Sequence, residues 1–236
     1  MVDGCRLYII TPERFDLRTF PDLFARALDA GDVAAVQLRL KNVAVDDWKR
    51  TIDALRPIAR AHGVAFLLND RADLVVAAWC DGAHVGQEDT PAREARHLMG
   101  AGRTLGDTCK SSHDLANRAV EDGADYVAFG AFFPSTSKQV TRLADPEILR
   151  SWSQKSTVSS CAIGGITAAN LAPLVRAGAN LLAIIGGVWN HPEGPAAGVR
   201  AINAAIQNIG GPRRAPQAPR GGSETPRDTR GAPREL

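Results

Sequence analysis

A strand pattern followed by a helix pattern repeats eight times along the first 208 residues, and this repetition leaves few folds open. Short runs rich in β-branched and aliphatic residues are separated by amphipathic stretches. The predicted strands are 6–11, 34–40, 65–70, 82–87, 104–109, 126–133, 160–165 and 181–188. Several are apolar at successive positions, as expected for strands of a parallel sheet that is covered on both faces.

The intervening stretches show helical periodicity and helix-end signals. The clearest predicted helices are 46–60, 112–121 and 167–176. In the first of them, Trp48, Ile52 and Leu55 fall on one apolar stripe. The last is expected to begin at Thr167, because a threonine hydroxyl can cap the first turn, and to end before Gly178.

The number of units favours a closed barrel over an open sheet. Eight strand–helix units in about 200 residues lie at the low end of the (β/α)8 range. An open, doubly wound sheet normally carries a glycine-rich phosphate loop after its first strand. Here the first strand is followed by Thr11, Pro12, Glu13 and Arg14, without a glycine. We therefore predict an α/β protein with one (β/α)8 TIM barrel over residues 1–208.

A change in composition marks the end of the predicted barrel. Residues 209–236 hold six arginines, three acidic residues, five prolines and five glycines. Such a segment buries too little apolar surface to offset its ordering entropy, so we predict a disordered Pro/Gly/Arg-rich tail. The tail contributes +3 to the net charge of +2, which leaves the barrel at −1. The tail has no aromatic residue, so its positive charge does not indicate a nucleic-acid partner.

The remaining composition suits a cytoplasmic protein. No stretch is long and apolar enough to span a bilayer, and the first ten residues do not resemble a secretory signal. The four cysteines are far apart in sequence, which excludes a paired zinc motif and suits thiols in a reducing compartment. We expect no membrane association, and a homo-oligomer is compatible with such a barrel.

Charged residues gather at the carboxyl ends of the predicted strands, where barrels of this kind have their active sites. Arg39 and Lys41 share one face of the second strand, so they need an anionic partner, either an acidic side chain or a ligand. Asp70 and Asp89 follow the third and fourth strands. They could cap helices, act as an acid–base pair, or bind Mg²⁺. A metal bridging these acids to a phosphorylated substrate accounts for acids and bases in one site.

The last three strands predict a second anion site. Ser135, Thr136, Ser137 and Lys138 follow the sixth strand and offer donors to phosphate oxygens, although a polar loop would have the same composition. Glycine pairs follow the seventh and eighth strands, where backbone N–H groups can approach a phosphate.

In this order and spacing, several stretches resemble the thiamine phosphate synthase family, within the superfamily that also holds thiazole tautomerase. They are QLRLK, LLNDRADL, DGAHVGQEDTP, GADYVAFGAFFPSTSK, AIGGITAAN and the glycine pair of the eighth strand. The resemblance covers nearly all of residues 1–208 and implies a TIM-barrel transferase of thiamine biosynthesis. Such an enzyme uses Mg²⁺ to join an aminopyrimidine methyl diphosphate to a thiazole phosphate, and it releases thiamine phosphate and pyrophosphate.

The resemblance also implies roles for individual residues. The implied substrate contacts are Gln37, Leu38, Arg39, Leu40, Lys41, Asn69, Thr108, Ser135, Thr136, Ser137, Lys138, Gly165, Ile185 and Gly186. The implied catalytic residues are Arg39, Lys41 and Lys138, which neutralise the departing diphosphate in a dissociative mechanism. Asp70 and Asp89 are the implied Mg²⁺ ligands.

The departures from the family pattern include changes in the second and fifth strands. Leu40 stands where a glutamate is usual, and Asp107 and Lys110 replace other residues around Thr108. Asp107 is expected to bring negative charge close to the diphosphate. The fifth-strand changes motivate one alternative, a non-catalytic barrel that binds thiamine precursors. A second alternative is a thiazole tautomerase-like enzyme, which shares the fold and the thiazole phosphate site. The two acids Asp70 and Asp89 favour the synthase.

Overall fold

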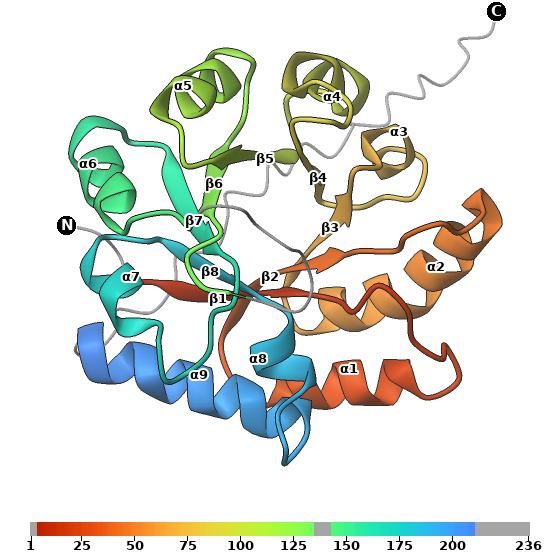
Figure 1. Ribbon diagram of the computed structural model, residues 1–236. Coiled ribbons are helices and arrows are strands. Elements are labelled where there is room, and N and C mark those ends of the chain that lie inside the picture. Colours follow the sequence, from red (N-terminus) through yellow and green to blue (C-terminus); the bar gives the residue numbers. More distant parts are fainter. Residues whose placement is uncertain (1–3, 135–142, 211–236) are drawn as a thin grey trace, which may run out of the picture.

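The structure is a computed structural model that describes residues 4–134 and 143–210. In these residues eight parallel strands pair in sequence order, and the last pairs with the first to close a barrel (Figure 1). The strands are β1 (Arg6–Ile10), β2 (Val33–Leu38), β3 (Ala65–Asn69), β4 (Gly82–Val85), β5 (Thr104–Lys110), β6 (Tyr126–Gly130), β7 (Ser159–Ile163) and β8 (Leu181–Ile184). The predicted TIM barrel is therefore confirmed.

Helices cover the outside of the barrel (Figure 1). They are α1 (Phe20–Asp29), α2 (Val45–Ala61), α3 (Ala72–Val75), α4 (Ala92–Met99), α5 (His113–Glu121), α6 (Glu147–Lys155), α7 (Ala172–Arg176), α8 (Gly186–Trp189) and α9 (Pro195–Gly210). Helix α9 includes the first two residues of the predicted tail, and the rest of that tail lies outside the described residues. In the part of the chain that the structure describes, no helix is long and apolar enough to cross a membrane.

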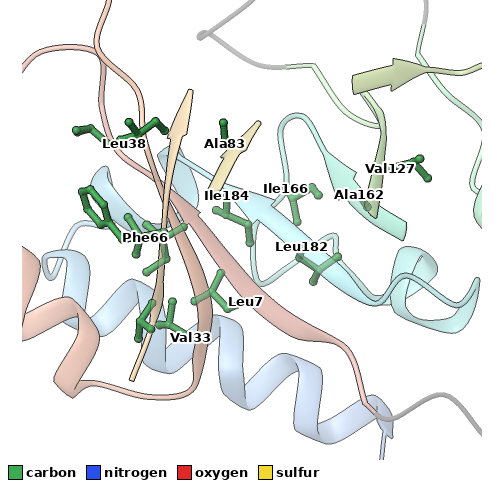
Figure 2. Packing of buried hydrophobic residues seen from close by; sticks show 14 of the residues in the cluster. Leu7, Val33, Leu38, Phe66, Ala83, Val127, Ala162, Ile166, Leu182 and Ile184 are labelled. Carbon is green, nitrogen blue, oxygen red and sulfur yellow. The ribbon is translucent and has the colours of Figure 1, made fainter. Parts of the chain in front are cut away.

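Successive residues of each strand contribute to two different cores. One set fills the barrel interior, and the other packs against the helices. The interior core consists of Tyr8, Ile10, Ala35, Leu67, Tyr126, Ala128, Cys161 and Ala183. Leu7, Leu38 and Phe66 belong to the outer core (Figure 2). Each fully buried large side chain of this kind contributes about 1.5–3 kcal/mol. This alternation decides which polar side chains point into the barrel.

Most of the expected strands end two to four residues early, and the two largest differences from the expected boundaries concern α7 and β8. Helix α7 begins at Ala172 rather than at Thr167. Thr167 starts a turn instead, and its backbone N–H donates to Asn170 Oδ1 over 2.8 Å. The eighth strand ends at Ile184, and the apolar run continues as the short helix α8 with buried Val188. A short apolar run has the same composition in a buried strand and in a buried helix, so its pattern did not separate the two.

Candidate active site

Two basic side chains at the end of β2 pair with acidic residues from neighbouring segments. The Arg39 guanidinium donates to Glu13, which lies on the loop after β1. The Arg39 backbone N–H donates over 2.9 Å to the hydroxyl of Thr11, which is fully buried. Lys41 Nζ lies 2.7 Å from Asp70 Oδ2, after β3. The structure therefore brings the predicted cations and one predicted acid together at one end of the barrel.

The second predicted acid joins this group from the loop after β4. Burial and a hydrogen bond with the Asp70 carboxyl raise the pKa of Asp89, while its Oδ2 accepts the backbone N–H of Gly86 over 3.1 Å. Asp70 has a φ of 59°, a left-handed conformation that asparagine and aspartate tolerate best among non-glycine residues. Two carboxyl groups are thus held in contact, an arrangement that a cation between them would stabilise.

This donor set fits magnesium better than zinc. Zinc sites are built from three or four nitrogen, sulfur or carboxylate ligands, whereas Mg²⁺ binds through one or two carboxylates together with waters and substrate phosphates. Within residues 4–134 and 143–210, no group of three or more His, Cys, Asp or Glu side chains could hold a metal ion. The pair of Asp70 and Asp89 meets the smaller requirement of Mg²⁺.

Amide side chains connect the acids to the barrel interior. Asn69 Nδ2 donates to the Asp70 carboxylate, and Asn69 Oδ1 accepts from Gln37 Nε2 over 2.8 Å. Gln37 and Asn69 are 3% and 8% exposed, so they form the floor of the barrel mouth. Both are predicted site residues, and the structure places them directly behind Asp70.

The interior also contains three polar side chains that the sequence pattern did not single out. Tyr8, His84 and Tyr126 are buried inside the barrel, where the two phenol oxygens lie 2.9 Å apart. His84 Nδ1 lies 2.8 Å from the Tyr126 hydroxyl, and His84 Nε2 lies 2.8 Å from Thr108 Oγ1. Burial lowers the pKa of His84 to about 4, against an opposing effect of Asp70, so the imidazole is neutral at pH 7. Its alternation with the outward residues Ala83 and Val85 was the available sequence signal.

Asp107 lies beside Thr108 on β5 but on the other face of the strand. It shares the outer face with Leu105, two residues earlier, and its side chain accepts a hydrogen bond from Gln87 Nε2 at 3.1 Å. Gln87 Nε2 also donates to the Thr108 carbonyl over 2.9 Å. Burial raises the pKa of Asp107 to about 6, and the charge of Asp122 adds to this effect. Asp107 therefore carries less negative charge near neutral pH than an exposed aspartate would.

Replacing Asp107 with asparagine is expected to stabilise the protein by about 1–3 kcal/mol at pH 8, because a tenfold difference in acidity between the folded and unfolded states corresponds to about 1.4 kcal/mol. A raised acid pKa means that ionisation opposes folding, and this cost grows as the pH rises from the unfolded value near 4 towards 6. Asparagine keeps the oxygen that Gln87 contacts. Thermal unfolding of both proteins between pH 3.5 and 8 measures the effect. The gain should vanish below about pH 4, and a lower melting temperature of the variant at pH 8 would contradict it.

The other predicted residues fall into three groups. Leu38 and Leu40 are buried in the outer core, so any substrate contact of theirs would involve main-chain atoms (Figure 2 shows Leu38). Gly165, Ile185 and Gly186 lie at the same end of the barrel as Asp70, after β7 and β8. Ser135, Thr136, Ser137 and Lys138 lie outside the described residues.

Two features of position 165 require glycine, a positive φ and the lack of space for a Cβ. Its φ is 63°, and a Cβ there would collide with the carbonyl oxygens of Phe133 and Pro134. Its own carbonyl accepts the side-chain N–H of Asn170 over 2.9 Å. The loop after β7 is thus packed directly against the end of the segment after β6.

Comparisons with known proteins agree with this geometry. The sequence model of the family described as thiamine monophosphate synthase matches residues 7–188. A thiamine-phosphate synthase of Rhodospirillum centenum is 55% identical over 203 residues, which are 86% of this chain and 98% of the relative. One of Hyphomonas neptunium is 46% identical over 86% of this chain and 95% of its own length. Among solved structures, a thiamine phosphate pyrophosphorylase of Pyrococcus furiosus superposes with a TM-score of 0.78 at 26% identity, and the match covers 89% of this chain and 98% of that one.

Proposed function

Because the chain belongs to the thiamine monophosphate synthase family, we propose that it joins an aminopyrimidine methyl diphosphate to a thiazole phosphate and releases pyrophosphate. The observation that carries this proposal is the 55% identity over 98% of a thiamine-phosphate synthase. The contact between Asp70 and Asp89 beside two cations supports the synthase over a tautomerase-like enzyme, since a diphosphate substrate requires such a site.

The diphosphate half of the site lies at the ends of β2, β3 and β4. Arg39 and Lys41 bind the diphosphate oxygens by charge-assisted hydrogen bonds, exchanging part of their contacts with Glu13 and Asp70. Asp70 and Asp89 are the residues that would hold Mg²⁺, which would supply positive charge for the diphosphate when bound.

The reaction breaks the bond between the pyrimidine methylene carbon and the diphosphate oxygen. The electron pair leaves with the diphosphate, and the amino group of the pyrimidine stabilises the resulting cation. The thiazole nitrogen then attacks the methylene carbon. Arg39 and Lys41 act where negative charge develops on the leaving group, which is the most effective place for electrostatic catalysis. The rest of the site orients the two rings, and no protein nucleophile is needed.

The thiazole phosphate is proposed to bind at the ends of β6, β7 and β8. Its contacts are the backbone of Gly165, Ile185 and Gly186 and the side chains of Ser135, Thr136, Ser137 and Lys138. The left-handed conformation of Gly165 supports this arrangement, because it allows the main chain to approach a ligand without a Cβ. Lys138 would reach the diphosphate from this side.

Incubation of the purified protein with both substrates and Mg²⁺ is expected to yield thiamine phosphate and one equivalent of pyrophosphate. Product is measured by chromatography and by coupled pyrophosphate detection. A reaction without the thiazole phosphate serves as the control, and it distinguishes condensation from simple hydrolysis. Absence of product at saturating substrates would refute the proposal, and isomerisation of a thiazole precursor instead would establish the tautomerase alternative.

A further inference from the structure

A continuous network of hydrogen bonds crosses the barrel interior and joins two residues at the barrel mouth. We call it the interior network, and its members in order are Asp70, Asn69, Gln37, Tyr8, Tyr126, His84 and Thr108. Its five middle members are each at most 8% exposed. At its two ends, the Asp70 side chain is 20% exposed and Thr108 is only partly buried. Buried polar groups of this kind must all be satisfied, and this fixes where the protons lie.

The direction of the network is set at Asp70. The Asp70 carboxylate accepts from Lys41 and from Asn69 Nδ2, so the Asn69 oxygen faces Gln37. Gln37 therefore presents its Nε2 to Asn69 over 2.8 Å and its Oε1 to Tyr8. Lysine can only donate, so Asp70 Oδ2 is the acceptor of both contacts, and each amide has one donor end and one acceptor end. The orientation of both amides follows from these two facts.

The orientation of the Gln37 amide determines which way the hydroxyl protons of Tyr8 and Tyr126 point. The Tyr8 hydroxyl is the donor to the buried Gln37 Oε1, over 3.4 Å, and the opposite direction would leave that oxygen unsatisfied. Burial raises the pKa of Tyr8 and of Tyr126, so each phenol keeps one proton. With the Tyr8 proton directed to Gln37, the Tyr126 proton is directed to Tyr8. The Tyr126 oxygen is then an acceptor for His84.

The orientation of the Tyr126 hydroxyl determines which ring nitrogen of His84 carries the proton. Its Nδ1 must carry the proton that Tyr126 accepts over 2.8 Å. Both of its ring nitrogens contact hydroxyl groups inside the barrel, where an uncompensated charge would be costly, so the ring is neutral. Its Nε2 therefore has no proton and accepts from the Thr108 hydroxyl. Gly106, on the same strand as Thr108, provides the space, since a Cβ there would collide with Tyr126 and His84 Nδ1.

We propose that the interior network fixes Thr108 as a hydrogen-bond acceptor towards the substrate, with Tyr8, Tyr126 and His84 as positioning residues. The Thr108 proton is committed to His84, so only the lone pairs of its oxygen remain for a ligand. An ionised phosphate has no proton to share with them, whereas an exocyclic amine has two. Thr108 thus binds the amino edge of the pyrimidine, and the diphosphate is left to Arg39, Lys41 and the metal. This substrate assignment rests on the proposed function, while the proton positions do not.

The first test measures the tautomer of His84 in the full chain without ligand. Nitrogen-15 NMR of histidine-labelled protein should show His84 Nδ1 protonated and Nε2 unprotonated at pH 7. The signals are assigned as those missing from the spectrum of a His84→Gln variant. In Tyr126→Phe the Nδ1 proton loses its acceptor, so we expect the proton to move to Nε2. A proton on Nε2 in the unmodified protein would overturn the proposal.

The second test measures binding of two probes, the hydroxymethyl aminopyrimidine and inorganic pyrophosphate with Mg²⁺. Thr108→Val should weaken the first probe roughly three- to tenfold, the equivalent of one neutral hydrogen bond, and leave the second unchanged. Thr108→Ser should restore binding. Tyr126→Phe should weaken the first probe to the same extent although Thr108 is intact, and this result would separate positioning from a merely structural role.

Controls keep the outcomes distinct. Cys161→Ala changes the same interior core outside the network and should leave binding of both probes unaltered. Weaker pyrophosphate binding by Thr108→Val, with the aminopyrimidine unaffected, would overturn the assignment. A protein with the expected tautomer that fails to bind the aminopyrimidine would refute the substrate assignment together with the proposed function, and it would leave the proton positions standing.

Discussion

Replacing Asp70 or Asp89 with asparagine is expected to lower kcat/KM by about a hundredfold or more, while the melting temperature stays the same or rises. The two carboxyl groups contact each other, and this contact helps to raise the pKa of Asp89. A bound Mg²⁺ between the two carboxylates, as proposed, would offset this repulsion. In the protein without ligand, the repulsion opposes folding.

The two asparagine variants fit their positions well. Residue 70 has a φ of 59°, which asparagine adopts as readily as aspartate does. An asparagine oxygen can still accept the N–H of Asn69 at position 70, or the N–H of Gly86 at position 89. Loss of activity would therefore report the missing charge rather than a misfolded loop.

The raised pKa of Asp89 gives the expected stability gain a pH dependence. Ionisation of a carboxyl with a raised pKa opposes folding, so the advantage of Asp89→Asn should be present at neutral pH and should disappear in acid as wild-type Asp89 becomes protonated. Melting curves at pH 4 and pH 8 measure this difference.

Asp73→Asn is the matched control for these variants. Asp73 lies on α3, is 52% exposed and pairs with Arg71, so its replacement should leave activity and its dependence on Mg²⁺ unaltered. Titration of activity with Mg²⁺ identifies the cause of the loss in the site variants. Unchanged turnover of Asp70→Asn or Asp89→Asn at limiting Mg²⁺ would refute the metal assignment.

The barrel was predictable from the sequence because the apolar runs, the helical stripes and the number of repeats all indicate the same fold. Apolar runs alternate with helical stripes eight times, and a closed parallel barrel accommodates all of them. The exact strand ends were not predictable. Residues 181–188 are apolar throughout, and only the main-chain path shows that the strand gives way to α8 at Gly186.

Prediction of the site was limited in a different way. Asp70 and Asp89 could be selected because carboxylates at strand ends are unusual enough to require a reason. Tyr8 and Tyr126 are 118 positions apart and resemble ordinary core aromatics, so their contact depends on the closure of the barrel. Glu13 was visible only as part of a loop without glycine, and its pairing with Arg39 depends on the register between β1 and β2.

Replacing Arg39 with glutamine is expected to lower kcat by about 10²–10³-fold, the usual effect of removing one preorganised donor from a developing negative charge. The Arg39 side chain is only 19% exposed and is directed by Glu13 and by the buried Thr11 behind its main chain. It is therefore in place before the diphosphate binds, and its preorganisation is what makes the donor effective.

The same substitution should change stability little. The partner Glu13 is 46% exposed and can be solvated by water when Arg39 is lost, and such pairs contribute about 0–1 kcal/mol. Arg39→Lys should show an intermediate loss, because lysine keeps the charge but cannot form two parallel hydrogen bonds to one anion. Glu13→Gln tests the pairing itself, and we expect a smaller fall in kcat with intact pyrophosphate binding.

Arg18→Gln is the control for the loss of one arginine outside the proposed site. Its side chain is 88% exposed and pairs with Asp16, on the segment between β1 and α1. Steady-state kinetics of the four variants, with pyrophosphate as product inhibitor, separate the effects on binding from those on the chemical step. If Arg39→Gln raised KM without lowering kcat, Arg39 would contribute equally to substrate and transition state, and its role would be binding of the diphosphate rather than stabilisation of its departure.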